Sequence, residues 1–310
     1  RDEALQVQVP RAHGPPSLYK AADLRYDVKH GYIEYAALVS LPTFAEETAA
    51  IAECRSHVEM CMLTSSGGEP HTRRMAEKSA EWLGPNGWKV AEDDEVKSLF
   101  DMGVVEWVAN ADIPRGSKVL DCKMVYKDKP STPGIPGRRK VRCVGRGFQE
   151  SMADYGDAFA PVCRHESARA FFATAAKLDE DLWSCDVRSA FLTAPLHRPV
   201  YMNAPQGHER DGYRFVVKKA IYGLCDAPRA YHQDFKKNLR SLSVVASDSD
   251  SCVFHSANSK YPSLWILCYV DDLICRGSAA DIAAFKADFQ HIYKIRDYGE
   301  PRSFIGMEIN

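Results

Sequence analysis

The chain has 310 residues, of which 45% are apolar and 26% charged, as in a globular protein of one or two domains. This composition excludes disorder throughout, and no apolar run approaches the length of about 18 residues that a membrane-spanning helix needs. The net charge is −2, but residues 44–112 carry 6 basic and 14 acidic side chains, whereas residues 115–149 carry 10 basic and 2 acidic ones. The basic stretch predicts a local site for an anion.

Helix and strand patterns interleave irregularly along the chain. Helical patterns cover, in order, residues 44–62, 72–83, 89–102, 166–177, 228–242 and 279–292. Strand patterns cover residues 118–127, 139–146, 182–187, 215–221, 264–270, 273–275 and 303–309, and a turn-rich segment over 130–137 joins the first two. This order predicts an α+β fold rather than a doubly wound parallel sheet.

The ten cysteines form no CxxC pair, which argues against a zinc ribbon or a thioredoxin-like site. Cys252 and His255 have the spacing of half a metal site but lack further partners. We therefore expect reduced thiols in an intracellular protein. The chain begins at Arg1 and its first methionine is Met60, so we expect it to be a fragment of a longer protein.

Two adjacent acids, Asp271 and Asp272, are expected at the tip of a hairpin with apolar arms. Neighbouring carboxylates beside a buried sheet repel each other and lose hydration, and a bound divalent cation would relieve both effects. The alternative is an ordinary polar β-turn.

A third acid, Asp186, ends the apolar strand predicted over residues 182–187. If that strand neighbours the hairpin, three acids converge at one end of one sheet. Such a set suits two Mg²⁺ ions about 4 Å apart that act on a phosphoryl group. The alternative for Asp186 alone is a cap at the end of a strand.

Lys140 and Arg142 lie two residues apart on a predicted strand, so their side chains project from the same face. Two cations on one face could hold a triphosphate, and Arg can bind it in a bidentate manner. The alternative is a solvated edge strand, on which basic residues hinder aggregation.

Eight segments in this order resemble the reverse transcriptase of copia-type LTR retrotransposons, from about residue 75 to the last residue. They are the spaced set Trp88, Ala91, Glu95, Leu99 and Trp107, followed by Lys140–Gln149, Asp154–Val162, Asp186–Leu192, Tyr201–Gly207, Tyr222–Arg229, Tyr269–Asp272 and Phe304–Ile309. The resemblance implies an RNA-directed DNA polymerase with a right-hand palm and fingers, an antiparallel catalytic sheet and a helical N-terminal extension.

The resemblance also implies roles for individual residues. Asp186 and Asp271 would be the catalytic metal ligands, Asp272 the third carboxylate, and the carbonyl of Val187 a further ligand of two Mg²⁺ ions, which Mn²⁺ could replace. Lys140 and Arg142 resemble the fingers residues that hold the incoming dNTP. Phe191 stands where the family places an aromatic gate against the ribose 2′-hydroxyl, and Phe304–Ile309 resembles the start of the primer-gripping hairpin.

The chain departs from the family pattern at two places. Cys225-Asp226 replaces a Lys-Gln pair, of which the Gln would lie near the incoming nucleotide, so Asp226 is also expected in the dNTP site. Thr193-Ala194 replaces an Asn-Gly pair. No departure removes a metal ligand.

We expect residues 1–74 to be a linker or extension and residues 75–310 to be the fingers and palm, without thumb, connection and RNase H regions. The expected partners are an RNA template, a DNA primer, dNTP and the remainder of the Pol polyprotein, with no membrane. The expected location is intracellular, in a cytoplasmic virus-like particle or in the nucleus. The alternative is a non-catalytic remnant that folds and binds nucleic acid without polymerising.

Overall fold

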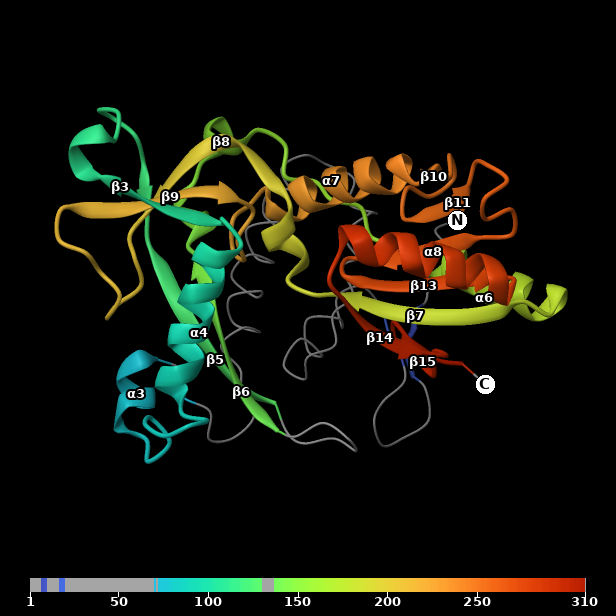
Figure 1. Ribbon diagram of the computed structural model, residues 1–310, viewed down its shortest axis with the longest axis horizontal. Helices are drawn as coiled ribbons and strands as arrows, with labels where there is room; N and C mark the ends of the chain where they lie inside the picture. The colour runs from blue at the N-terminus through green and yellow to red at the C-terminus, as the bar shows by residue number, and fades with distance from the viewer. Residues whose placement is uncertain (1–6, 10–16, 20–69, 71, 130–136, 310) are drawn as a thin grey trace. The chain divides into compact units, whose positions relative to one another are not determined.

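The computed structural model describes residues 7–9, 17–19, 70, 72–129 and 137–309. The chain divides into two compact units, residues 1–71 and 72–310. In the first unit, strands β1 (Val7–Val9) and β2 (Ser17–Tyr19) form an antiparallel pair, and the helix predicted over residues 44–62 lies outside the described residues. The second unit contains the other described elements and all the residues of the candidate site (Figure 1).

The candidate acids lie on a six-stranded antiparallel sheet, which agrees with the predicted α+β class. The strand order is β10-β11-β12-β13-β7-β14, so β7 lies between two strands that come much later in the chain. This insertion places the strand of Asp186 next to the hairpin of Asp271 and Asp272. The six strands are β7 (Asp181–Val187), β10 (Val244–Ala246), β11 (Val253–Ser256), β12 (Trp265–Tyr269), β13 (Asp272–Gly277) and β14 (Ile295–Gly299).

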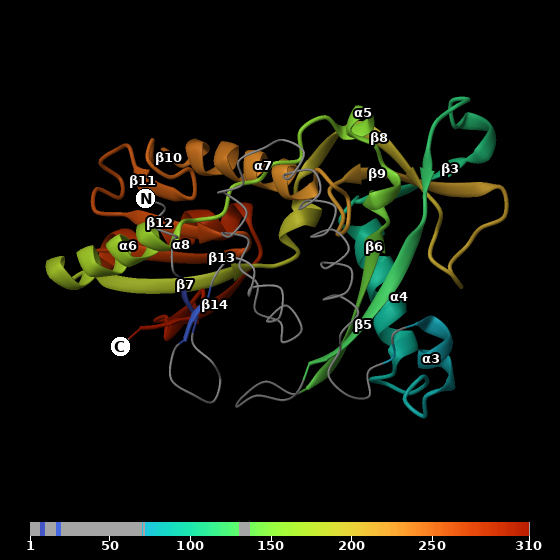
Figure 2. The same ribbon diagram turned by 180° about the vertical axis from the view of Figure 1, so that it is seen from behind.

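Helices cover both faces of this sheet. Successive residues of a strand point to opposite faces, and on β13 Leu273 belongs to the larger apolar core while Ile274 belongs to a smaller one. Phe285 of α8 lies in the larger core and Phe171 of α6 in the smaller one. Figure 1 accordingly shows α8 in front of the sheet, and Figure 2, from behind, shows α6 in front. The helices are α6 (His165–Leu178), α7 (Ala227–Ser241) and α8 (Ala279–Ile292).

The remaining long strands form a four-stranded sheet and a separate hairpin. The sheet has the order β3-β9-β8-β4, and only β4 and β8 are parallel. The hairpin consists of β5 and β6, and α4 lies along it (Figure 1). Glu95 of α4 accepts a hydrogen bond from the backbone N–H of Cys143 at 3.0 Å, which fastens the helix to β6. These elements are α4 (Trp88–Asp101), β3 (Val105–Ala109), β4 (Val119–Leu120), β5 (Cys122–Lys129), β6 (Arg138–Gly145), β8 (Pro195–Met202) and β9 (Tyr213–Lys219).

Helix α3 (Arg73–Lys78) is shorter than the helix predicted over residues 72–83. The Ser79 hydroxyl and backbone N–H both donate to the Ala76 carbonyl, at 2.7 and 3.0 Å, and so close the helix after Lys78. Helix α4, in contrast, ends as predicted before Gly103, whose φ of +63° suits a residue without a side chain. None of the described helices is both long enough and apolar enough to cross a bilayer.

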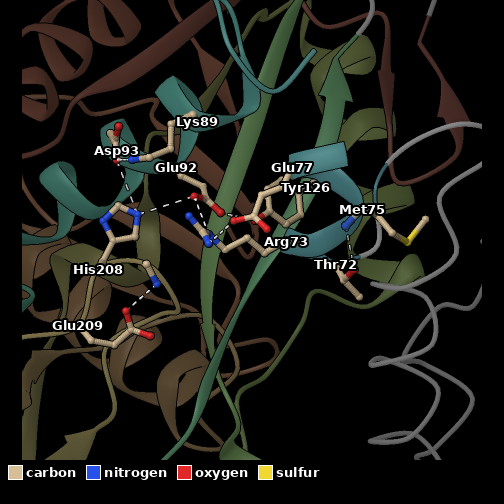
Figure 3. A network of polar contacts seen from close by, with 11 residues as sticks. Thr72, Arg73, Met75, Glu77, Lys89, Glu92, Asp93, Tyr126, His208 and Glu209 are labelled. Atoms are coloured by element: carbon tan, nitrogen blue, oxygen red, sulfur yellow. Dashed lines mark hydrogen bonds and ion pairs between the residues drawn. The ribbon is translucent and has the colours of Figure 1, made fainter. Parts of the chain in front are cut away.

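A buried carboxylate, Glu92 of α4, joins α3, β5 and the segment that follows β8 (Figure 3). Its side chain has no exposed surface. It accepts hydrogen bonds from the Tyr126 hydroxyl and from Arg73 Nε, the latter at 3.3 Å. His208 Nε2 lies 3.8 Å from the same carboxylate. Four segments distant in the sequence therefore converge on one buried charge.

The strand predicted over residues 303–309 is instead a small hairpin. Its strands are β15 (Ser303–Phe304) and β16 (Met307–Glu308). Ile305 and Gly306 adopt positive φ values of 41° and 77°, and two successive residues of this kind reverse the chain in a two-residue turn. Short helical turns at η3 (Asn110–Asp112), η4 (Gly147–Gln149), α5 (Met152–Tyr155) and η5 (Ala190–Thr193) complete the described connections.

Candidate active site

The three acids meet at one end of the six-stranded sheet. Asp186 of β7 and Asp272, the first residue of β13, are direct partners in the antiparallel register. Such partners project to the same side, so both lie on the face that carries Ile274. Asp271 lies in the preceding two-residue turn, and its carbonyl accepts a hydrogen bond from the Val187 backbone N–H at 2.9 Å. The sequence predicted both hairpin acids in the turn, whereas Asp272 begins the strand.

The turn between β12 and β13 is strained at Val270. Its φ is 58°, a region that β-branched side chains rarely adopt. A tight antiparallel hairpin requires positive φ at the first turn position, which glycine would adopt without strain. Holding valine there costs on the order of 1–3 kcal/mol, and the pairing of β12 with β13, which includes Tyr269 with Asp272, offsets this cost. The strained residue directly precedes Asp271.

Burial, together with neighbouring negative charge, shifts the pKa values of two of the acids. Burial and the nearby Asp271 raise the pKa of Asp186, although Lys140 and Arg296 act in the opposite direction. Asp272 keeps exposed surface, but partial burial of its carboxyl, together with Asp271 and Asp186, raises its pKa to about 6. A cation bound between these acids would favour their ionised forms.

The donor set fits Mg²⁺. In the part of the chain that the structure describes, no three His, Cys, Asp or Glu side chains are already grouped as a metal cage. Mg²⁺ does not need such a cage, because it commonly takes one or two carboxylates and completes its octahedral shell with water and phosphate oxygens. Asp186, Asp271 and Asp272 offer hard oxygen donors at one end of the sheet.

A hollow of about 510 Å³ opens beside Asp272. Ser184 and Asp272 bound it on the side of the sheet. Tyr298 of β14 also bounds it, and Arg302 and Phe304 bound it on the side of the β15–β16 hairpin. Of the three acids, Asp272 therefore borders open space, next to the β15–β16 hairpin.

Lys140 and Arg142 of β6 are half-buried. Burial, with the charges of Arg142 and Lys129, lowers the pKa of Lys140 to about 8. The charge of Lys140 also acts on Asp186 and lowers the pKa of that carboxyl. Nε of Arg142 is buried and has no hydrogen-bond partner among the described residues. Strand β6 pairs only with β5 among the described strands, so it is an edge strand, and its two basic residues are half-buried.

Two further cations near the acids were missed by the sequence analysis. Arg296 of β14 is the register partner of Asp186, on the side opposite to Asp272. Lys129, near the end of β5, also acts on Asp186. Neither lies in a recognisable motif, and only the insertion of β7 between β13 and β14 brings Arg296 into place.

Phe191 lies in η5, which a short connection joins to β7, the strand of Asp186. Its ring is half-buried and makes edge contacts with the rings of Tyr222 and Tyr231, at centroid distances of 5.4 and 5.8 Å. The flanking residues Ala190 and Leu192 are buried in the core. Phe191 thus stands at the edge of the core rather than at its centre.

Asp226 directly precedes α7 and forms an ion pair with Arg198 of β8. The guanidinium binds both Asp226 oxygens, at 2.8 and 2.9 Å. The same guanidinium lies 2.7 Å from Glu150. The carboxylate of Asp226 is therefore directed to Arg198, a pairing across 28 residues that no sequence pattern indicates.

Comparison with known proteins identifies what this arrangement resembles. Residues 106–310, which include all three acids, match the family model described as reverse transcriptase (RNA-dependent DNA polymerase). The chain is 32% identical over 224 residues to the retrovirus-related Pol polyprotein from transposon TNT 1-94 of Nicotiana tabacum, covering 71% of this chain and 17% of that protein. It is 26% identical over 265 residues to the Pol polyprotein from transposon RE1 of Arabidopsis thaliana, and the match covers 84% of this chain and 18% of that protein. The chain is 27% identical over 249 residues to the Pol polyprotein from transposon RE2 of the same plant, and the match covers 79% of this chain and 16% of that protein. The chain spans less than a fifth of the length of these curated relatives.

Proposed function

Because the chain belongs to the reverse transcriptase family of copia-type Pol polyproteins, we propose that residues 75–310 are the fingers and palm of an RNA-directed DNA polymerase. The six-stranded sheet would be the palm, and the β5–β6 hairpin with α4 would belong to the fingers. Residues 1–74 would be a linker or extension. The proposal depends chiefly on one observation, the pairing of Asp186 with Asp272 beside the Asp271 turn, within the region that the family model matches.

In the proposed reaction, the 3′-hydroxyl of a DNA primer attacks the α-phosphate of a dNTP, and pyrophosphate leaves. The carboxylates of Asp186, Asp271 and Asp272, with the carbonyl of Val187, would hold two Mg²⁺ ions or Mn²⁺ in their place. When bound, Mg²⁺ supplies Lewis-acid activation of the hydroxyl and neutralises charge on the phosphates. The hollow between Asp272 and the β15–β16 hairpin would offer room for the primer end.

The basic strand would bind the incoming nucleotide. Lys140 and Arg142 share one face of β6, and the charge of Lys140 already acts on Asp186. With a pKa of about 8, Lys140 remains mostly protonated at neutral pH and can contact a triphosphate. Asp226 would not repel that triphosphate strongly, because its charge is directed to Arg198.

Phe191 would exclude the ribose 2′-hydroxyl. Its ring is half-buried and lies a few residues beyond Asp186, so part of it remains available to a ligand at the metal site. Two aromatic neighbours, Tyr222 and Tyr231, hold the ring from other sides. A ring held in place discriminates by size better than a mobile one, because exclusion depends on a clash that cannot relax.

The proposed partners are an RNA template, a DNA primer, dNTP and the remainder of a Pol polyprotein, within the cell. Most template contacts would go to the phosphate backbone, so binding should weaken as salt rises.

Primer extension on a primed RNA template tests the proposal. The full chain is supplied with labelled primer and dNTP, with Mg²⁺ or with EDTA, and RNA affinity is measured in parallel. We expect primer extension in the reaction with Mg²⁺ and none in the reaction with EDTA. Retained RNA binding without extension, at any Mg²⁺ or Mn²⁺ concentration, would refute the proposal and favour the non-catalytic remnant.

A further inference from the structure

We propose that Tyr222 is a positioning residue that orients two groups at once, the guanidinium of Arg142 and the ring of Phe191. The proposal rests on the function proposed above, in which Arg142 contacts the triphosphate and Phe191 contacts the sugar of the same dNTP. Tyr222 would thereby link phosphate binding to sugar selection.

The backbone of Tyr222 is fixed to the end of β6. Its carbonyl accepts a hydrogen bond from the Gly145 N–H at 2.8 Å, and the Gly223 carbonyl accepts one from the Gly147 N–H at 3.0 Å. A side chain at Gly223 would place its Cβ 2.1 Å from the Gly145 carbonyl oxygen, and Gly223 has a φ of +89°. Only glycine permits this approach, which brings Tyr222 beside the strand that carries Arg142.

The side chain of Tyr222 lies between the two groups. Cζ of Arg142 is 5.2 Å from the centroid of the Tyr222 ring, within the range of a cation–π contact. The ring of Phe191 is 5.4 Å from the same ring at an interplanar angle of 76°, which is an edge-to-face contact. Tyr222 and Phe191 both pack on the larger core. One ring therefore touches a group from the basic strand and a group from the turn that follows the acid strand.

The contact with Tyr222 has consequences for Arg142. Nε of Arg142 is buried and has no hydrogen-bond partner among the described residues. Tyr222 restrains the guanidinium in two ways, through the ring contact and through a hydrogen bond between the two side chains. A planar guanidinium binds phosphate in a bidentate manner only when its plane is correctly oriented. Burial raises the pKa of the Tyr222 phenol, although the charge of Arg142 and its hydrogen bond with Tyr222 act in the opposite direction, so the phenol stays neutral at physiological pH.

The test compares Tyr222→Leu, Tyr222→Phe and a matched control in the full chain. The control is Tyr213→Leu, because Arg210 lies over the Tyr213 ring at 4.0 Å but Tyr213 stands on β9, outside the proposed site. Primer extension gives kcat and KM for dNTP and the ratio of rNTP to dNTP incorporation. Thermal unfolding and RNA affinity monitor the fold. Calorimetric binding of dNTP to a complex with a dideoxy-terminated primer gives a Kd without chemistry.

We expect Tyr222→Leu to raise the KM and Kd for dNTP about tenfold, which is the loss of affinity expected when a partly desolvated cation–π contact is removed. We expect kcat to change less than about threefold, and the rNTP to dNTP ratio to rise. Tyr222→Phe keeps the ring but loses the hydroxyl that interacts with Arg142, so its KM, Kd and incorporation ratio should lie between those of the wild type and of Tyr222→Leu. Tyr213→Leu should match the wild type.

Wild-type KM, Kd and ratio in Tyr222→Leu would overturn the proposal, as would a loss in Tyr222→Phe equal to that in Tyr222→Leu. Equal losses of dNTP and rNTP use with a lowered Tm would also overturn it, since they would show a purely structural role. Absence of extension by the wild type defeats the proposed function, while the Kd comparison still tests Tyr222. A wild type that binds no dNTP defeats both.

Discussion

Replacement of Glu92 by alanine should destabilise the protein strongly. The Glu92 side chain has no exposed surface, and the side chain of Arg73, its ionic partner, is 15% exposed. The substitution removes the acceptor of the Tyr126 hydroxyl and of Arg73 Nε, and it removes one of the two carboxylates near His208 (Figure 3). Arg73 keeps a second partner, Glu77, so its charge is not left wholly unpaired.

Removing one partner of a buried ion pair costs about 3–5 kcal/mol. Because Glu77 still pairs with Arg73, we expect the lower end, about 3 kcal/mol, which is roughly a hundredfold change in the unfolding equilibrium. Glu92→Gln keeps an acceptor for Tyr126 but loses the charge, so its cost should be about 1–2 kcal/mol.

The assay is urea unfolding of the full chain at pH 7.5. The matched control is Asp93→Ala, at the next position of the same helix, where the carboxylate is 51% exposed, pairs with Lys89 and lies 3.7 Å from His208 Nε2. An exposed pair of this kind contributes about 0.5 kcal/mol or less. A loss below about 1 kcal/mol for Glu92→Ala, or equal losses at positions 92 and 93, would refute the reasoning.

The stability that Glu92 provides should also depend on pH. Burial raises the pKa of Glu92, but His208, Tyr126 and Arg73 outweigh burial, and the pKa is lowered from its usual 4.5. A carboxylate with a depressed pKa stabilises the folded state above its unfolded pKa and loses this effect as pH falls. The gap in stability between the wild type and Glu92→Gln should therefore narrow below about pH 4.5 and stay constant above pH 6.

Three predictions concern the candidate site. Asp272→Asn should raise the Tm in EDTA at pH 7.5, because the Asp272 pKa of about 6 means that its ionised form destabilises the fold. This gain in Tm should vanish near pH 4, and a gain that persists at pH 4 would contradict the explanation. Mg²⁺ should raise the Tm of the wild type more than that of the variant. Arg142→Glu should raise the KM for dNTP at least about tenfold while RNA affinity changes less than about threefold; equal loss of RNA affinity with an unchanged KM would assign the strand to the template. Phe191→Val should raise the rNTP to dNTP incorporation ratio and leave Mg²⁺ binding intact; an unchanged ratio with a lowered Tm would make Phe191 a core residue only.

Local patterns predicted the elements on which the acids lie. The apolar runs around residues 182–187 and 264–275 indicated β7, β12 and β13, because strands covered on both faces need apolar residues throughout. The same-face spacing of Lys140 and Arg142 likewise depends only on the period of a strand. These features follow from residues close in sequence.

Long-range pairings could not be predicted in the same way. The position of β7 between β13 and β14 places Arg296 beside Asp186, and nothing local encodes that order. Strand β8 (Pro195–Met202) was not predicted, because Pro195 and Pro199 lack backbone N–H groups and proline within a segment argues against a strand. The Ile305-Gly306 reversal was also missed, since an isoleucine with positive φ is uncommon.

The most direct test of the central claim compares Asp186→Asn with Asp181→Asn in Mg²⁺-dependent primer extension. Both acids belong to β7, but Asp181 is exposed at the opposite end and pairs with Gly277. If the acid cluster holds the catalytic metal ions, Asp186→Asn should lower the extension rate at least about 100-fold, since a bound metal ion stabilises the transition state by several kcal/mol. Asp181→Asn should extend at the wild-type rate, and both variants should keep the wild-type Tm within a few degrees. Extension by Asp186→Asn at the wild-type rate would contradict the account.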